Sequence, residues 1–247
     1  AYKDMKSNIS KIRSVALGLF LAGAMAGCAD KEIEVNPGGL TPVRFGAGIE
    51  MPTRTTSGGD QWADGDRVGI FMLRSGGTIP GDVLTVGGIL ANNVGYKATP
   101  GGDATRADLS PAVAGRALYY PQDGSAVDFI AYYPFSMLLL ADPHRLDVSL
   151  ATQTDPAALD VLWGRATGYS KADPEASLTM DHVLSKVTLN LKPGDGLTRA
   201  DIEGMAEGSV AFGSMPSSVR VNLTDGSSVA RVPAGFALRK ASSPAEG

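Results

Sequence analysis

The chain has 247 residues, of which 43% are hydrophobic and 19% are charged, and its formal net charge is −4. A hydrophobic content of this size is ordinary for a globular protein and excludes general disorder, and the length permits one or two domains. The acidic balance argues against a nucleic-acid partner, because nucleic-acid binding needs basic patches.

The N-terminus has the layout of an export signal. A stretch with three basic residues, 6–13, precedes an apolar segment, 15–26, that ends in small residues before Cys28. The apolar segment is about half of the roughly 20 residues that span a bilayer as a helix, so a retained membrane helix is not expected. This pattern predicts a bacterial lipoprotein signal over residues 1–27, with lipid on Cys28 after cleavage. The alternative is an ordinary signal peptide that is cleaved elsewhere.

Cleavage before Cys28 would change both the charge and the anchoring of the mature chain. Residues 1–27 carry four basic residues and one acidic residue, so their loss from the 22 basic and 26 acidic residues leaves a net charge of −7. Two or three acyl chains would hold the protein stably at the outer membrane, where one chain would not. Residues 28–42 contain charges and a Pro-Gly-Gly break, which predicts a flexible tether. Charged residues 30–32 also resemble the surface-export signals of some outer-membrane lipoproteins, although a solvated linker explains them equally well.

From residue 43 the pattern is that of β-strands. Residues 43–49 alternate between apolar and other residues, as a half-buried strand does, and a polar turn follows over 53–66. Residues 68–73 are almost continuously apolar, as in a central strand. A further strand is predicted over 118–121, where it ends at Pro121. Another is predicted over 127–134, with Val127, Phe129, Ala131 and Tyr133 on one face.

The second half of the chain continues this pattern. A short strand is predicted at 160–166, a loop at 168–176, and the clearest alternation at 187–191 and 219–223, the latter pairing with 229–232 across a turn. The only predicted helices after the signal are short, at 156–159 and 198–205. Strands at this spacing with Gly, Asp and Pro turns favour β-sandwiches. We predict one β-sandwich domain over 43–176 and the start of a second over 177–247.

The sequence offers no catalytic constellation. His144 and His182 are interpreted as structural, and no nucleophile elbow, zinc helix, Walker loop or dinucleotide fingerprint occurs. Asp60, Asp64 and Asp66 surround a glycine, but the spacing of a calcium loop is not met, so a turn is the better interpretation. We therefore expect no enzyme activity, no cofactor and no metal.

Aromatic residues define a competing hypothesis. A surface protein that binds glycan would present a concave cluster of exposed aromatic side chains, and the chain has only Trp62 and Trp163 as tryptophans. Tyrosines in strands belong more often to the core and to cross-strand pairs. This applies to the four tyrosines of the predicted strands, Tyr119, Tyr120, Tyr132 and Tyr133.

Several motifs in order resemble the fimbrillin family. They are Arg54-Thr55-Thr56, the segment 62–72, the strands 118–121 and 127–134, and the segments 160–163 and 181–189. The resemblance covers residues 43 to 225 and implies two transthyretin-like β-sandwich domains in a lipoprotein precursor of type V pili. It also implies export, cutting by an Arg-specific protease, and polymerisation with other pilin subunits by donor-strand exchange. Many family members are instead minor, tip or anchor subunits.

The resemblance is incomplete at the C-terminal end. A fimbrillin's second domain is usually much longer than residues 177–247 and often ends in a strand that can be donated. We therefore expect an incomplete second β-sandwich in a truncated product, which places self-polymerisation in question.

Strand addition is the physical basis of the expected function. An incomplete sandwich presents unpaired backbone groups that an inserted strand satisfies. Residues 43–49 are the candidate for the segment removed, and Arg54 is the candidate cut site, with Arg44 inside the strand pattern as the less accessible alternative. These features predict a fimbrial structural or accessory subunit that serves adhesion, with host surface ligands as further partners. The alternative is a surface lipoprotein of the outer membrane that binds glycan or another ligand without polymerising.

Substitution of Cys28→Ser should abolish lipid attachment, because serine has no thiol to carry the acyl chain. Cells expressing wild-type and variant protein would be labelled with a fatty-acid analogue, and the label on each purified chain measured. A variant that still carries the label would refute lipidation at this residue.

Overall fold

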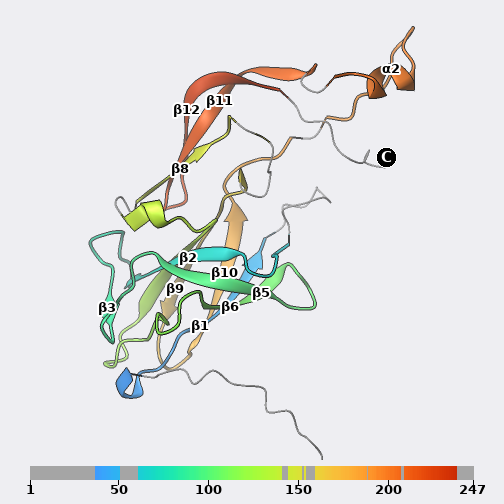
Figure 1. Ribbon diagram of the computed structural model, residues 1–247. Coiled ribbons are helices and arrows are strands. Elements are labelled where there is room, and N and C mark those ends of the chain that lie inside the picture. Colours follow the sequence, from blue (N-terminus) through green and yellow to red (C-terminus); the bar gives the residue numbers. More distant parts are fainter. Residues whose placement is uncertain are drawn as a thin grey trace, which may run out of the picture. The chain divides into compact units, whose positions relative to one another are not determined.

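The computed structural model describes residues 37–50, 61–140, 144–151, 153, 159–187, 189–206 and 209–237. Within these residues the protein is built almost entirely of β-strands (Figure 1). Its helical elements include the 3-10 turns η1 (Pro37–Gly39) and η2 (Met137–Leu140) and the helix α2 (Arg199–Glu203). The predicted all-β class is confirmed, as is the short helix near 198–205. None of the helices in this described part has the length and apolar character of a bilayer-spanning segment.

Seven strands form one closed sheet, in which the last strand pairs back with the first. The predicted transthyretin-like sandwich is not confirmed. β1 pairs with β10 on one edge and with β6 on the other, so the strands form one closed sheet. The order around the sheet is β1 (Arg44–Ile49), β10 (Glu175–His182), β9 (Leu162–Tyr169), β7 (Val127–Tyr133), β2 (Arg67–Arg74), β5 (Val94–Pro100) and β6 (Arg106–Pro111).

The interior of the closed sheet is the main hydrophobic core. Strands alternate their side chains between two faces, so every second residue points inward. Val68, Ile70 and Met72 of β2 face the same core as Val127, Phe129 and Ala131 of β7. The inward face predicted for 127–134 is therefore confirmed, with Tyr133 partly buried against this core, and the strand itself ends at Tyr133.

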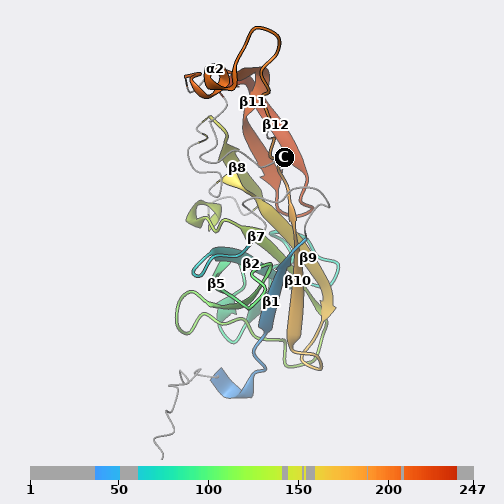
Figure 2. The ribbon, with the colours of Figure 1, turned by 90° about the vertical axis from the view of Figure 1, so that its right-hand side faces the viewer.

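A second, three-stranded sheet has the order β12-β11-β8. Its strands are β8 (Arg145–Ser149), β11 (Ala211–Asn222) and β12 (Ser228–Ala237), and β11 and β12 form a long hairpin that is visible in Figures 1 and 2. Val219 lies opposite Ala230, and Arg220 lies opposite Val229. The predicted pairing of 219–223 with 229–232 is confirmed. A small hairpin, β3 (Thr85–Val86) and β4 (Ile89–Leu90), completes the strands.

The strands β2 and β7 are buried on both faces. Their outward residues form a second hydrophobic cluster with residues of β8, β11 and the segments next to them. This double burial is why residues 68–73 read as a continuous apolar run rather than an alternating one. The members contributed by β2 and β7 are Phe71, Leu73, Ile130 and Tyr132, and those from the second sheet include Leu146, Val219 and Val221.

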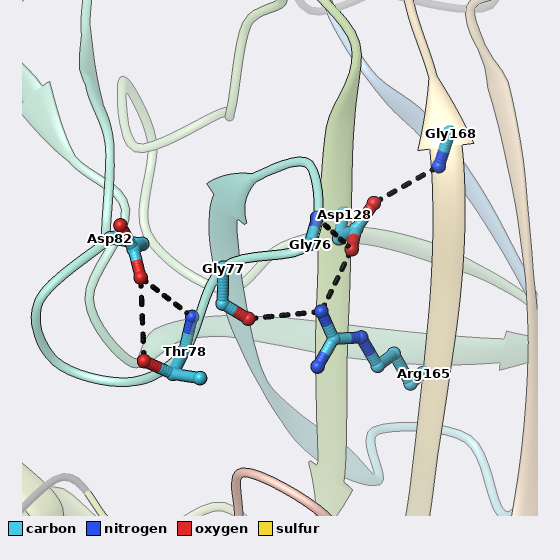
Figure 3. Close-up of polar contacts among 7 residues, drawn as sticks. All are labelled: Gly76, Gly77, Thr78, Asp82, Asp128, Arg165 and Gly168. Carbon is cyan, nitrogen blue, oxygen red and sulfur yellow. Dashed lines mark hydrogen bonds and ion pairs between the residues drawn. The ribbon is translucent and has the colours of Figure 1, made fainter.

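One carboxylate on the outward face of β7 connects three chain segments. Asp128 is buried and accepts hydrogen bonds from the backbone N–H of Gly76 at 2.9 Å, from that of Gly168 at 3.1 Å and from Arg165 Nη2 at 2.8 Å (Figure 3). Arg165 also donates to the carbonyl oxygen of Gly77 at 2.9 Å. Burial raises the pKa of Asp128, but the Arg165 and backbone hydrogen bonds and the Arg165 charge outweigh it and hold the pKa below its usual value.

The loop that Asp128 holds is closed by a second carboxylate. Asp82 accepts from the backbone N–H of Thr78 at 2.9 Å and from its hydroxyl at 3.3 Å (Figure 3). The chain between β2 and β3 is therefore tied at both ends, to itself and to the closed sheet.

One predicted strand is absent. Residues 185–187 and 189–192 belong to no strand, and Val187, Leu189 and Leu191 are 54%, 46% and 48% exposed. The strand prediction at 187–191 is therefore wrong for these residues, although its alternation is clear. A strand needs a neighbour to satisfy its backbone groups, and no described strand pairs with this one.

Two predicted boundaries also change. The boundary between 176 and 177 falls inside β10, which pairs with β1 from Glu175 to Met180 and continues from the hairpin with β9. β8, from before this boundary, pairs with β11, from after it. The predicted tether over 28–42 is also too long, because Leu40 is buried and Pro42 forms a bridge with Tyr119.

Several strands were missed. The segment expected to be a loop at 168–176 contains the end of β9 and the start of β10, and β5, β6 and β8 were not predicted. β10 did carry a usable signal, because Ala176, Leu178 and Met180 alternate with polar residues. Residues 118–121 contribute only the bridge at Tyr119 rather than a strand.

We expect Asp128→Asn to lower the free energy of unfolding by about 3 kcal/mol, because the buried Arg165 hydrogen bond loses its charged partner. The matched control is Asp147→Asn, since Asp147 pairs with Arg220 at 2.7 Å while its side chain is 59% exposed. Loss of such an exposed pair should cost about 1 kcal/mol or less. Denaturant titration of both variants at neutral pH measures the difference, and equal losses would contradict a special role for Asp128.

The stability that Asp128 adds should disappear in acid. Because the folded-state pKa is lowered, this stability is fully present above the unfolded-state value, about 3.9, and is lost as the pH falls through the folded value. The difference between wild type and Asp128→Asn should therefore stay constant from about pH 7 to about pH 5 and shrink below about pH 4. A difference that does not depend on pH would show that the carboxylate charge is not its source.

Candidate functional site

The candidate site is β1 together with the two strands on either side of it. β1 links the edges of β6 and β10, because both strands pair with it and not with each other. Beyond the ladders, the backbone N–H groups of Val43 and Arg44 donate at 2.9 Å to carbonyl oxygens of Leu118 and Pro174. At the other end, the backbone N–H of Glu50 donates to the carbonyl oxygen of Met180 at 3.0 Å. β1 is therefore a strand held on both edges along its whole length.

Four side chains of this segment fill the core. Val43, Phe45, Ala47 and Ile49 are between 2% and 7% exposed. The predicted alternation of residues 43–49 is confirmed, and it places these four side chains in the main core cluster.

Phe45 occupies an aromatic pocket. Its ring meets Tyr96 edge-on at a centroid distance of 5.1 Å and Phe129 at 4.9 Å. Such edge-to-face pairs add about 0.5–1.5 kcal/mol beyond area burial. Tyr96 is itself fixed, because its hydroxyl accepts a hydrogen bond from the Leu118 N–H at 2.8 Å. Tyr120 extends the pocket by packing against Phe129 at 6.1 Å.

The outward face of β1 is nearly bare. A Cβ atom added at Gly46 would meet nothing within 4 Å, and one at Gly48 would only reach the Arg106 side chain at 4.0 Å. Arg44 is exposed and pairs with Glu175 at 3.3 Å. The outward positions therefore contribute little packing, and the strand is held by its backbone and its four inward side chains.

The two predicted modification residues, Cys28 and Arg54, lie outside the described residues. Arg54 falls in the segment 51–60, which connects the end of β1 to the turn that enters β2. Arg44, the alternative cut site, lies within the ladder with β10 and has its backbone N–H bonded. A protease needs an unpaired extended backbone, so Arg44 is the poorer candidate.

The remaining predicted residues take structural roles. His182 Nδ1 lies 2.7 Å from Asp160 Oδ1, and the carbonyl oxygen of His144 accepts from the Leu223 N–H at 2.8 Å. Asp66 accepts from the Ala63 N–H at 2.9 Å, which is a turn leading into β2. In the part of the chain that the structure describes, no group of three or more His, Cys, Asp or Glu side chains could hold a metal ion.

The aromatic residues considered for glycan binding lie mostly inside the protein. Trp62 is buried and packs edge-on against Tyr133, while Trp163 donates from Nε1 to the Leu223 carbonyl oxygen at 2.8 Å. Tyr119, Tyr120 and Tyr132 are also buried. Neither tryptophan supplies the exposed platform that the glycan hypothesis requires.

Comparison with known sequences agrees with the resemblance. The model of the fimbrillin-like family matches residues 53–237. A candidate fimbrium subunit of Bacteroides uniformis, Fim1C, is 28% identical over 220 residues, which cover 87% of this chain and 66% of that protein. The chain thus spans slightly less than two thirds of this curated relative.

Two solved structures share the fold. A candidate cell adhesion protein from Bacteroides uniformis superposes with a TM-score of 0.62 at 23% identity, covering 83% of this chain and 71% of that one. A second, from Bacteroides ovatus, gives a TM-score of 0.58 at 17% identity, covering 84% of this chain and 75% of that one. At these identities the similarity establishes the fold alone.

Phe45→Ala should lower the free energy of unfolding by about 3–5 kcal/mol, because a buried ring and its aromatic contacts are replaced by a cavity. Gly46→Ala is the matched control, since its added methyl points into open space and should change stability by less than about 1 kcal/mol. Both would be measured by chemical denaturation of the chain starting at Ala29. Equal stability of the two variants would mean that β1 is not packed as described.

Proposed function

The chain belongs to the fimbrillin-like family, and from this premise we propose its function. The chain is a fimbrial subunit that assembles by strand exchange at the position of β1. It is exported as a lipoprotein, anchored through Cys28 in the outer membrane at the cell surface, and cut after Arg54. Its partners are other pilin subunits, and the assembled fimbrium serves adhesion.

The observation that carries this proposal is the place of β1 in the sheet. A cut after Arg54 would leave β1 connected to the domain only by non-covalent contacts, because the strand lies wholly before the cut. Its loss would unpair one edge of β6 and one edge of β10 together. Two facing edges with unpaired backbone groups are the acceptor that strand addition needs.

Energetics favour exchange over simple release. Full burial of Val43, Phe45 and Ile49 contributes about 1.5–3 kcal/mol for each side chain, and the backbone bonds on both edges would return to water at the same time. A cut strand should therefore stay in place until another strand replaces it. This behaviour keeps single subunits folded and restricts opening to the time of assembly.

The alternative function is a surface lipoprotein that binds a ligand without polymerising. It shares the lipid anchor and the surface location but needs no cut at Arg54. The buried position of Trp62 and the internal hydrogen bond of Trp163 do not favour it.

The test is to treat the chain starting at Ala29 with an Arg-specific protease and measure the product by mass spectrometry. Wild type should lose the fragment that ends at Arg54 when a donor-strand peptide is added, whereas Arg54→Ala should keep β1 and bind no peptide. The same substitution should leave the unfolding midpoint unchanged and block incorporation into fibres. If wild type is cut after Arg54 and accepts no strand, the chain does not polymerise and the ligand-binding alternative takes its place.

A further inference from the structure

We infer that the site vacated by β1 selects an incoming strand by an ordered pattern of side chains, and that this order also sets the direction of the strand. The pattern is an apolar residue, an aromatic residue, a small residue and an apolar residue at the positions of Val43, Phe45, Ala47 and Ile49. This inference rests on the proposed strand exchange and names the kind of strand that the site accepts.

The backbone of the site cannot set the direction. β1 runs parallel to β10 and antiparallel to β6. A strand that enters in either direction therefore forms one parallel and one antiparallel ladder. Since both directions offer the same two kinds of ladder, discrimination between them falls to the side chains.

The position of Phe45 requires an aromatic ring. Its register neighbours are Ala176 on β10 and Leu109 on β6, and its ring is enclosed by Tyr96 and Phe129. Both of these aromatic walls are almost fully buried. A small side chain at this position would leave a cavity between two fixed rings, which cannot close by a simple shift.

The position of Ala47 requires a small side chain. Ala47 lies opposite Ala107 on β6 and Leu178 on β10, and all three are buried. A ring here would enter a filled interior and force its neighbours out of their preferred conformations. A strand that keeps the same four inward positions but runs in the opposite direction exchanges the residues at positions 45 and 47. It therefore meets one cavity and one overlap.

The outward positions carry no such selection. Added side chains at Gly46 meet open space, and those at Gly48 approach only a flexible arginine. The pattern is thus restricted to alternate residues, and the residues between them are free to differ among incoming strands.

The experiment uses the chain starting at Ala29, cut after Arg54, freed of its N-terminal fragment in denaturant and refolded with synthetic peptides. The reference peptide has the sequence of residues 41–50. A Phe45→Ala peptide should bind roughly a hundredfold more weakly or worse, and an Ala47→Phe peptide roughly tenfold more weakly or worse. Whichever direction it runs, neither of these two peptides places a ring at the position of Phe45 and a small side chain at the position of Ala47. A Gly46→Ser peptide is the control and should bind within roughly threefold of the reference.

Direction is measured with a nitroxide on the peptide N-terminus. In the reference complex it should broaden NMR signals near Leu118 and leave those near Met180 sharp. A peptide with the residues at positions 45 and 47 exchanged should reverse this result, because only the opposite direction then places its ring among Tyr96 and Phe129.

The outcomes separate this inference from the function it rests on. If the reference peptide does not bind, strand exchange itself is wrong. If the reference peptide binds but the Phe45→Ala and Ala47→Phe peptides bind equally well, exchange stands and the selective pattern is overturned. Broadening at the same end for the reference and the exchanged peptide would overturn the control of direction.

Discussion

The closure of the sheet by β1 is the interaction on which the rest of this structure depends. β6 and β10 are far apart in sequence and do not pair with each other, so β1 is the strand that bridges their edges. The core inside is filled from all seven strands, and β1 supplies its share through residues that a single cut in the chain would disconnect. Under the proposed cut after Arg54, β1 would be both a structural member of the sheet and a removable one, which distinguishes it from the six other strands.

The second sheet depends on the first through the strands β2 and β7. Both present apolar side chains on two faces, one toward the closed interior and one toward the cluster with Leu146, Val219 and Val221. The polar exception on the outer face is Asp128, which is satisfied by one arginine and two backbone N–H groups. Burial of this charge is tolerable because each hydrogen bond compensates part of the lost hydration. The loop before β3 is ordered through the same contacts.

The sequence predicted the strands whose pattern can be recognised within the segment itself. It failed where the presence of a strand depends on pairing with a distant segment. Residues 43–49 were recognised because inward and outward positions differ in polarity, and residues 68–73 because a continuous apolar run marks a strand that is buried on both faces. The alternation at 187–191 is equally regular, yet no described strand lies beside it, and alternation alone does not reveal a missing partner. The return of β10 to β1 also could not be anticipated, because a parallel pairing between residues 44 and 175 leaves no mark in either segment. For the candidate site, the sequence identified the strand, whereas the aromatic pocket around Phe45 needed the spatial neighbours Tyr96 and Phe129. The predicted cut site Arg54 lies outside the described residues and stays a prediction.

The same long-range pairing imposes an order on folding. Contacts between residues distant in the chain form late, because loop closure must precede them. β1 is made first, but its β6 edge waits for residues 106–111 and its β10 edge waits for residues 175–182. During N- to C-terminal synthesis the chain therefore carries β1 with at least one unpaired edge until residues 175–182 have been made. An unpaired strand edge with one apolar face favours association with other chains, so the interval before closure is the one in which misassembly competes with folding.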